Sequence, residues 1–197
     1  MLDDFRADLR HFTGLKGSGD TRLARMRNLL SSQGVWAAAV YRFGLWVHCQ
    51  APRPIALPLK LPYLVAQKLV EIATGIRIPA RATIGPGLYI GHFGGIILHA
   101  DTVMGRACSL SPGVVIGVVG GGREGVARIG DGVYLGAGAK VLGPVTIGDG
   151  ARVGANAVVV EDVPAGATAV GVPARVRTRT AARRDPVRPV GHRGASR

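Results

Sequence analysis

The sequence predicts a mainly β protein: a parallel β-helix of hexapeptide repeats, with an α-helical region in front of it. Two observations support this fold class. Aliphatic residues recur every six positions between Ile72 and Pro173, a period that matches neither a flat strand nor an α-helix. Before the repeats, apolar residues follow helical spacing instead. We therefore expect helices followed by stacked coils.

The six-residue repeat has a characteristic composition, because its aliphatic residue is usually followed by Gly. An aliphatic side chain at every sixth position stacks on its equivalents in neighbouring coils, and the small residue lets the chain turn a corner. Three hexads give a triangular turn of about 18 residues, so the repeats provide about five coils. The pairs are Ile84-Gly85, Ile90-Gly91, Met104-Gly105, Ile116-Gly117, Ile129-Gly130, Leu135-Gly136, Ile147-Gly148 and Val153-Gly154.

Three helical segments are expected ahead of the repeats. The first spans Asp3 to Phe12. The second spans Thr21 to Cys49, with breaks near Gly34 and at Gly44, and the third spans Leu61 to Thr74. Such a region covers the open N-terminal end of a β-helix and contributes to contacts between subunits.

The charge of the chain is concentrated at its C-terminal end. Of a net charge of +13, the segment from Arg175 to Arg197 supplies +7, with eight Arg against the single acid Asp185. This composition indicates a solvated extension, and the lack of interleaved aromatic residues argues against nucleic-acid binding. We expect three parts: a helical region at 1–71, the β-helix at 72–176 and a basic, disordered tail at 177–197.

Cysteine use and hydropathy point to a cytoplasmic protein. Cys49 and Cys108 are far apart, and no secretory leader is recognisable at the N-terminus. The apolar stretches are interrupted by Arg, Lys and Pro before they reach the roughly 20 residues that span a bilayer, so no membrane span is expected. Trp36 and Trp46 are expected in the core or at an interface rather than as ligand platforms.

Two interruptions of the six-residue rhythm mark the candidate site, since sites in repeat proteins are often built on insertions. Between Ile90 and Leu98, eight residues replace six and form a bulge that carries His92. Between Ile116 and Ile129, a Gly-rich excursion leaves the coil. It is long enough to reach over a neighbouring surface.

These features resemble the hexapeptide-repeat acyltransferases, and within them the serine O-acetyltransferases and related exopolysaccharide-type acetyltransferases. The resemblance rests on the bulge with His92, on the run from Ile129 to Gly143, and on Asp162-Val163-Pro164 with Gly171-Val172-Pro173-Ala174-Arg175. It implies a left-handed β-helix that forms a trimer, or a dimer of trimers, with active sites between subunits. Acetyl-CoA would lie in a groove along the coils as co-substrate, without a metal.

By this resemblance His92 is the general base. Moving an acetyl group from a thioester to a hydroxyl requires a group that accepts the hydroxyl proton, and imidazole suits this role near neutral pH. Backbone amides at Gly94 and Gly95 are candidates for stabilising the oxyanion. His99 has no matching role and is expected to be structural or exposed.

The same resemblance suggests how the cofactor is held. A thin pantetheine arm needs a groove with small walls, which Gly117, Ala137 and Ala155 offer, together with Gly138, Ala139 and Asn156. Lys140, Arg175 and Arg177 are candidates for the CoA phosphates by charge complementarity. Small residues at these corners are also what any β-helix requires.

Four positions depart from the serine acetyltransferase pattern. The family usually has an Asp just before the catalytic His, where this chain has Gly91. An Arg-His pair of the long excursion is replaced by Gly125 and Val126, and the Asp that orients the imidazole corresponds to Arg77. Recognition of an amino-acid acceptor is therefore in question.

The excursion offers two replacements. Glu124 of an adjoining subunit is a candidate partner for His92, and Arg123 a candidate for meeting an anionic acceptor. The sequence ends in Ser196-Arg197, whereas serine acetyltransferases dock into cysteine synthase through an aliphatic terminal residue. A cysteine synthase complex is therefore not expected.

Three functions remain open at this stage. The first is CoA-dependent O-acetylation, of serine or of a sugar hydroxyl in polysaccharide biosynthesis. The second is a metal-dependent hydratase, which is disfavoured because it needs three His around zinc and the repeats contain only His92 and His99. The third is a trimeric scaffold without catalysis.

Overall fold

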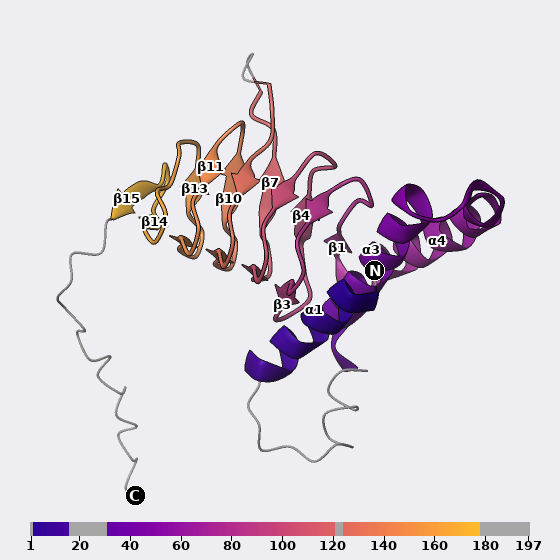
Figure 1. Ribbon diagram of the computed structural model, residues 1–197. Helices are drawn as coiled ribbons and strands as arrows, with labels where there is room; N and C mark the ends of the chain where they lie inside the picture. The colour runs from indigo at the N-terminus through magenta and orange to yellow at the C-terminus, as the bar shows by residue number, and fades with distance from the viewer. Residues whose placement is uncertain (1, 16–30, 121–123, 178–197) are drawn as a thin grey trace, which may run out of the picture.

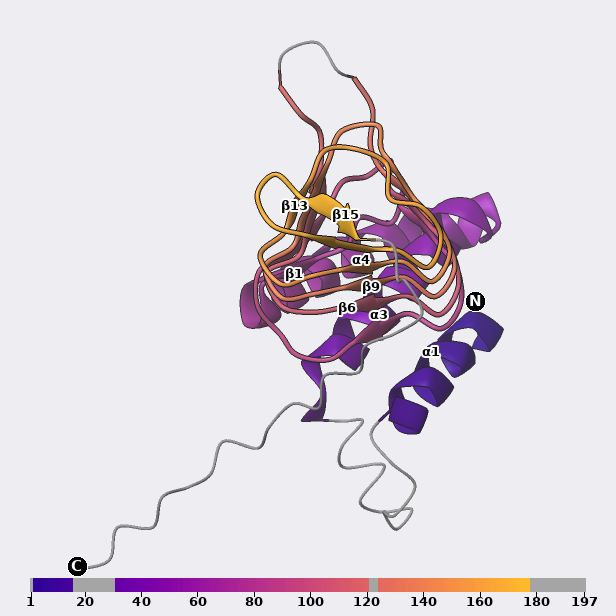
Figure 2. The same cartoon turned by 90° about the vertical axis from the view of Figure 1, so that its left-hand side faces the viewer.

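A computed structural model describes residues 2–15, 31–120 and 124–177 of the chain. The repeats form a triangular prism, and the described helices lie at and beside its N-terminal end (Figure 1). Seen along the prism axis, successive coils stack directly on one another (Figure 2). The β-helix predicted from the six-residue period is confirmed.

Within these residues the strands form three sheets, one for each prism face, and their pairing is parallel except at the last strand. The first sheet contains β1 (Ile76–Arg77), β4 (Ile96–Leu98), β7 (Val115–Gly117), β10 (Lys140–Leu142) and β13 (Val158–Val159). The second contains β2 (Thr83–Ile84), β5 (Val103–Met104), β8 (Arg128–Ile129) and β11 (Thr146–Ile147). The third contains β3 (Tyr89–Ile90), β6 (Ser109–Leu110), β9 (Tyr134–Leu135), β12 (Arg152–Val153), β14 (Thr168–Val170) and β15 (Arg175–Arg177).

The aliphatic residues of the hexads line the inside of the prism. Leu98, Ile116, Val141 and Val159 are in register in one sheet and are all buried. Because each coil covers the apolar side chains of the next, the core is one continuous column that excludes water along the prism.

Polar side chains tie the coils together at a corner. The carboxylate of Asp131 accepts a hydrogen bond from the Arg106 amide at 2.7 Å, and that of Asp149 accepts one from the Asp131 amide at 2.7 Å. Asp162 does the same for the Thr146 amide. The Arg106 amide, and after it the Arg106 guanidinium, lower the pKa of Asp131 below its ordinary value.

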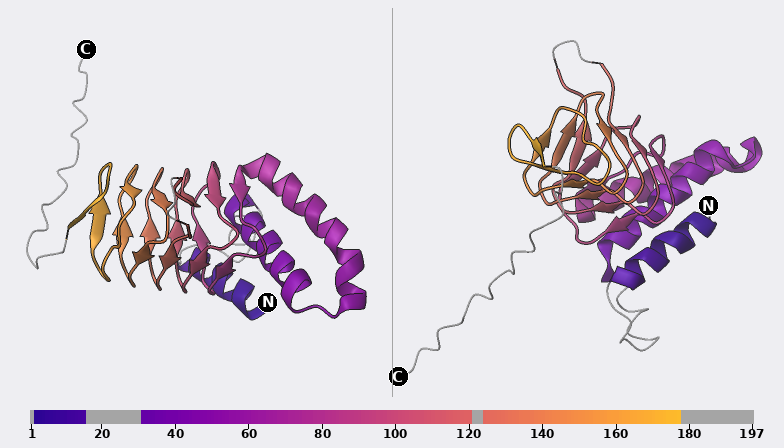
Figure 3. Two further views of the ribbon diagram at one scale, coloured as in Figure 1. Left: turned by 90° about the horizontal axis from the view of Figure 1, so that it is seen from above. Right: turned by 60° about the vertical axis from the view of Figure 1, so that its left-hand side comes forward.

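The described helices are α1 (Leu2–Leu15), α3 (Gln33–Cys49) and α4 (Arg53–Thr74). Helices α3 and α4 form a hairpin beyond β1, and α1 lies along the first coils (Figure 3). The break expected near Gly34 corresponds to Ser32, where α3 is capped, whereas residues 21–30 of that predicted helix lie outside the described residues.

Two details of the helical prediction are wrong. Helix α3 does not break at Gly44, because the ring of Tyr63 packs where a side chain at position 44 would lie. Helix α4 begins at Arg53 rather than Leu61 and includes Pro58 and Pro62. Local rules place a helix end near proline, but packing against α3 overrides them here.

A buried ion pair joins the helices to the first coil. Asp8 of α1 and Arg42 of α3 are only 3% and 2% exposed, and their side chains lie 2.9 Å apart. Asp8 also accepts hydrogen bonds from the Gly87 and Leu88 amides, and Arg42 donates to the Ile84 carbonyl. Every charge in this network is therefore paired or hydrogen-bonded, as burial requires.

The structure also bears on the expectations for the two tryptophans and for membrane spans, and on the end of the repeat pattern. Trp46 stacks on Phe43 with ring centroids 6.3 Å apart, while Trp36 is partly exposed. No helix in the described part of the chain is long and apolar enough to cross a membrane. At the far end of the prism, β15 pairs antiparallel with β14, a reversal that the repeat pattern does not predict.

Candidate active site

The bulge with His92 is fixed at its base by backbone hydrogen bonds. It connects β3 to β4, and Gly94 and Gly95 adopt φ angles of 111° and 63°, which favour glycine. The Gly94 amide donates to the Thr74 carbonyl at the end of α4, and the Gly94 carbonyl accepts from the Gly113 amide of the next coil. The bulge is thus held from two sides.

His92 is exposed at the rim of a cavity of about 170 Å³. Gly91, His92 and Phe93 form one side of this cavity. The other side comes from the start of α3 and the residues before it, namely Ser31, Ser32, Gln33 and Gly34. The imidazole is accordingly positioned beside a space that an acceptor hydroxyl can enter, which is what a general base requires.

Sequence reasoning missed the serine and glutamine residues of this cavity. Helix α3 reaches the bulge because Gly34 packs directly on the Ile90 carbonyl, where any side chain would overlap. That contact joins residues far apart in the chain. The only local signal was Ser32, a residue type that often precedes a helix.

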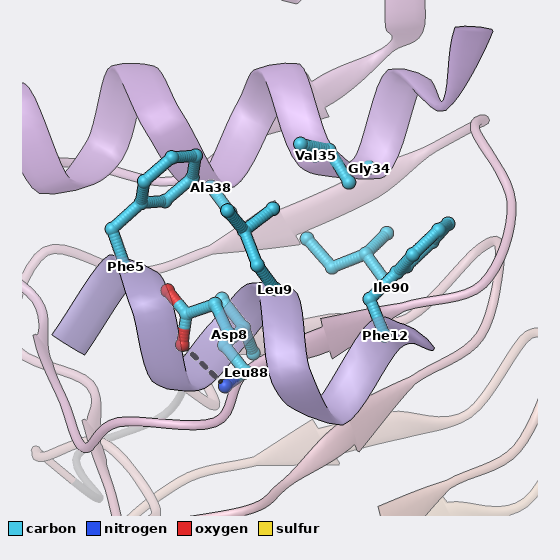
Figure 4. A pocket seen from close by; sticks show the side chains of 9 residues that line it. All are labelled: Phe5, Asp8, Leu9, Phe12, Gly34, Val35, Ala38, Leu88 and Ile90. Atoms are coloured by element: carbon cyan, nitrogen blue, oxygen red, sulfur yellow. Dashed lines mark hydrogen bonds between the residues drawn. The ribbon is translucent and has the colours of Figure 1, made fainter. Parts of the chain in front are cut away.

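A second, much smaller hollow supports this arrangement. It lies between α1, α3 and β3, and with about 10 Å³ it has room for no more than about one water. Figure 4 shows Phe5, Leu9 and Phe12 of α1 packed toward Ala38 and Ile90. We interpret it as a packing seam that fixes the start of α3 against the strand leading to His92.

The structure distinguishes between the two amides expected to form an oxyanion hole. Because the Gly94 amide donates to Thr74 at 2.9 Å, it is not available to a ligand in this conformation. Gly95 remains as the candidate. It packs on the Gly113 backbone of the next coil, which fixes its position.

The residues expected along the cofactor groove lie on successive coils beyond the bulge. Ala137 and Ala155 are exposed and Gly117 is half-buried, so these positions present small walls. Lys140 is already partly engaged, since its ammonium donates to the Gly113 and Gly138 carbonyls at 3.0 Å each. This leaves one of its three protons for a phosphate.

The two C-terminal arginines lie at the end of the prism. Arg175 and Arg177 are exposed on β15. They are therefore accessible to a phosphate group, several coils away from the bulge (Figure 1).

The positions that depart from the family pattern are placed as follows. Arg77 is exposed on β1, and Glu124 is exposed in the excursion. Gly125 packs against Pro144, and Val126 packs against the core. Arg123 lies outside the described residues.

Two further features concern the site, namely His99 and the possibility of a metal centre. His99 is half-buried, and its Nδ1 accepts a hydrogen bond from the Asp101 amide at 3.2 Å, in keeping with a structural role. Among the residues that the structure describes, no group of three His, Cys, Asp or Glu side chains is arranged to hold a metal ion.

Comparisons with known proteins agree with this architecture. Residues 127–160 match the bacterial transferase hexapeptide model of six repeats. A serine acetyltransferase of Synechococcus elongatus is 36% identical over 81% of this chain and 63% of its own length. One from Mycobacterium tuberculosis is 36% identical over 80% of this chain and 70% of its own length. This chain therefore spans less than two thirds of the Synechococcus protein.

Solved structures show the same fold. The serine acetyltransferase of Neisseria gonorrhoeae in complex with serine has a TM-score of 0.76 and 29% identity, covering 90% of this chain and 69% of that chain. A serine acetyltransferase in complex with CoA has a TM-score of 0.72 and 30% identity over 89% of this chain and 69% of that one. With its hexapeptide prism, its relatives and these structural neighbours, the chain belongs to the serine acetyltransferase family of left-handed β-helix proteins.

Proposed function

We propose that this protein transfers an acetyl group from acetyl-CoA to an acceptor hydroxyl, with His92 as general base. The observation that carries the proposal is an exposed imidazole at the rim of a cavity, on a bulge held by backbone hydrogen bonds. The similarity to a serine acetyltransferase solved with serine and to one solved with CoA supports the two substrate classes. L-serine is therefore the reference acceptor.

The reaction follows from the chemistry of the groups. His92 accepts the proton as the hydroxyl oxygen attacks the thioester carbonyl, and the imidazolium then returns that proton to the departing sulfur of CoA. The Gly95 amide is the candidate donor to the oxyanion that forms between these steps. His92 is thus the group on which both proton transfers depend.

The coenzyme would extend from the bulge along the coils. Ala137, Ala155 and Gly117 leave room for its pantetheine arm, and Asn156 is exposed beside them. Arg175 and the remaining proton of Lys140 are the candidate phosphate contacts. CoA supplies the activated thioester, and the chain supplies the groove and the base.

We also propose that the protein acts as a homotrimer, or as a dimer of trimers, with sites at the subunit seams. Support comes from the solvent side of α4, where seven large apolar residues are exposed. They are Ile55, Leu57, Leu61, Leu64, Val65, Leu69 and Ile72. An apolar helix face of this extent is unusual on a monomer.

The organisation and location of the chain are proposed from the same features. A helical part at 1–71, a catalytic prism at 72–176 and a basic tail at 177–197 remain the division that we propose. Cys49 and Cys108 are both free thiols, which suits the reducing environment of the cytoplasm.

The proposal is tested by thiol release from acetyl-CoA. Substituting His92→Gln, which removes the base but keeps a polar side chain, is expected to lower kcat by about 10²- to 10⁴-fold. His99→Gln is the matched control and is expected to retain wild-type turnover, because the His99 imidazole contacts the amide and carboxylate of Asp101, two residues away in the chain. Undiminished turnover by His92→Gln would exclude the mechanism, and absence of acetyl-CoA binding by calorimetry would favour a scaffold.

A further inference from the structure

Among the described residues that line the cavity beside His92, none besides the histidine carries an ionisable side chain. Hydroxyls of Ser31 and Ser32, the amide of Gln33 and the ring of Phe93 provide its functional groups. An amino acid brings both an ammonium and a carboxylate, and a site that selects it recognises these groups through side chains of opposite charge. The described lining of the cavity supplies neither an acid nor a Lys or Arg.

The position directly before His92 is tightly packed against Tyr89. A Cβ at Gly91 would lie 3.2 Å from the Tyr89 ring and 3.3 Å from its hydroxyl, so a side chain there would require the tyrosine to shift by a few tenths of an ångström. Tyr89 is in turn held by α1, with the Phe12 and His11 rings 5.6 Å and 6.0 Å away. Glycine at position 91 therefore fits the packing of Tyr89 without any shift.

The groups that are present suit a different acceptor. Phe93 is 57% exposed and offers an apolar ring face next to the base. Ser32 caps α3 without a side-chain hydrogen bond to its own helix, so its hydroxyl is not used by the cap. An aromatic face together with uncharged donors and acceptors is complementary to a ring that carries both C–H faces and hydroxyls.

From this we infer that the acceptor is a neutral sugar, a pyranose that packs one face on Phe93 and presents a hydroxyl to His92. The inference rests on the proposed function, because it names the acceptor of the same reaction. The sugar O–H bond and the thioester C–S bond break, and an acetyl ester and the CoA thiol form. Neutral hydroxyls are matched by the Ser32 and Gln33 side chains, without a buried charge to compensate.

The first experiment compares acceptors with the full-length protein and acetyl-CoA. The panel contains L-serine, the methyl glycosides of glucose, galactose and N-acetylglucosamine, and methyl glucuronide as a charged sugar. We expect kcat/KM for at least one neutral glycoside to exceed that for L-serine and for the glucuronide by tenfold or more. Product identity is checked by mass spectrometry of the acetylated sugar.

Each outcome has a defined meaning. Preference for L-serine, or turnover of no glycoside while acetyl-CoA still binds by calorimetry, overturns the sugar inference but leaves O-acetyl transfer standing. Failure to bind acetyl-CoA at all overturns the proposed function itself. The two failures are therefore distinguishable.

The second experiment tests the role of Phe93 with the preferred glycoside. Phe93→Ala is expected to raise its KM by roughly tenfold, the size of effect that loss of one aromatic contact gives. Phe93→Tyr keeps the ring face and is expected to restore the KM. Leu2→Ala removes an exposed apolar side chain at the start of α1 and serves as the control. An unchanged KM in Phe93→Ala, or no rescue by tyrosine, would contradict the proposed stacking.

Discussion

Cys108 shows how the environment of one side chain sets its chemistry. It lies inside the prism, and its thiol donates to the Gly130 carbonyl at 3.2 Å. Burial raises its pKa from 9.0 to about 11, because the thiolate would lose its hydration. Cys49, at the end of α3, is exposed.

The two thiols are therefore expected to differ sharply in reactivity. At pH 8, a disulfide reagent should modify Cys49 rapidly and Cys108 only on unfolding. The reagent cannot reach the buried Cys108 thiol, and that thiol remains protonated at this pH. The chromophore released per chain, measured before and after addition of denaturant, gives the number of reactive thiols in each state. Cys49→Ser is the control and should lose the fast reaction. Two fast equivalents would show that the prism interior is open.

The raised pKa of Cys108 also gives the direction of a pH effect on stability. The folded state holds the thiol proton more tightly than the unfolded state, so this contribution is fully present below pH 9. It is lost as the pH rises toward 11. Cys108→Ala should flatten that part of the alkaline stability profile.

The hydrogen bonds of Lys140 could not be predicted from the sequence. Its place in a Gly-Ala-rich run and its charge suggest a phosphate contact, but only the stacking register reveals that the Gly113 carbonyl lies within 3.0 Å of it. The buried hexad positions, in contrast, were predictable, because the period alone places Leu98 and Ile116 inside. His92 was recognised from a break in that period, whereas Ser32 and Gln33 were not, since they meet the bulge only through tertiary packing.

At the scale of elements, the contact between helices and prism depends on a few polar side chains. Tyr41 of α3 donates to the Ala82 carbonyl and accepts from the Ile84 amide, and Arg42 beside it pairs with Asp8 of α1. Two helices therefore share one anchoring point on the first coil. The start of α3, which lines the cavity, is fixed by the same contacts.

Removing one member of the buried pair should be far more harmful than removing both. Asp8→Ala leaves the Arg42 guanidinium buried without its counter-ion, and a loss of about 3–5 kcal/mol in the free energy of unfolding is expected. Asp8→Leu combined with Arg42→Leu should be less destabilised than Asp8→Ala, because no buried charge remains. Asp3→Ala, at an exposed ion pair with Arg6, is the control and should change stability by less than about 1 kcal/mol.

Urea denaturation at neutral pH measures these differences. If Asp8→Ala were as stable as Asp3→Ala, the network would not hold α1 in place. In that case the cavity wall formed by α3 would need another support.

At the scale of the whole molecule, α4 exposes a long row of large apolar side chains when the chain is alone. Its inner side packs on α3, while its outer side leaves Leu61 and Leu69 largely exposed. A second copy that covers this side would bury them together with their neighbours, which supplies the free energy of association.

Charges on that side should therefore prevent assembly. The double substitution Leu61→Glu and Leu69→Glu is expected to shift the protein from a trimer or hexamer to a lower oligomer in light scattering, while circular dichroism shows that it remains folded. Lys60→Glu with Lys68→Glu adds acids without removing apolar area and controls for charge. An unchanged mass in the leucine variant would place the interface elsewhere.

The reversal of the last strand has a consequence for solubility. A stack of parallel coils ends in a row of open backbone groups, which is a template for joining one molecule to the next. In this chain β15 folds back antiparallel onto β14 and presents Arg175 and Arg177 at the rim. On this face of the prism the last parallel strand is therefore already paired, and it is not available to template the addition of another molecule.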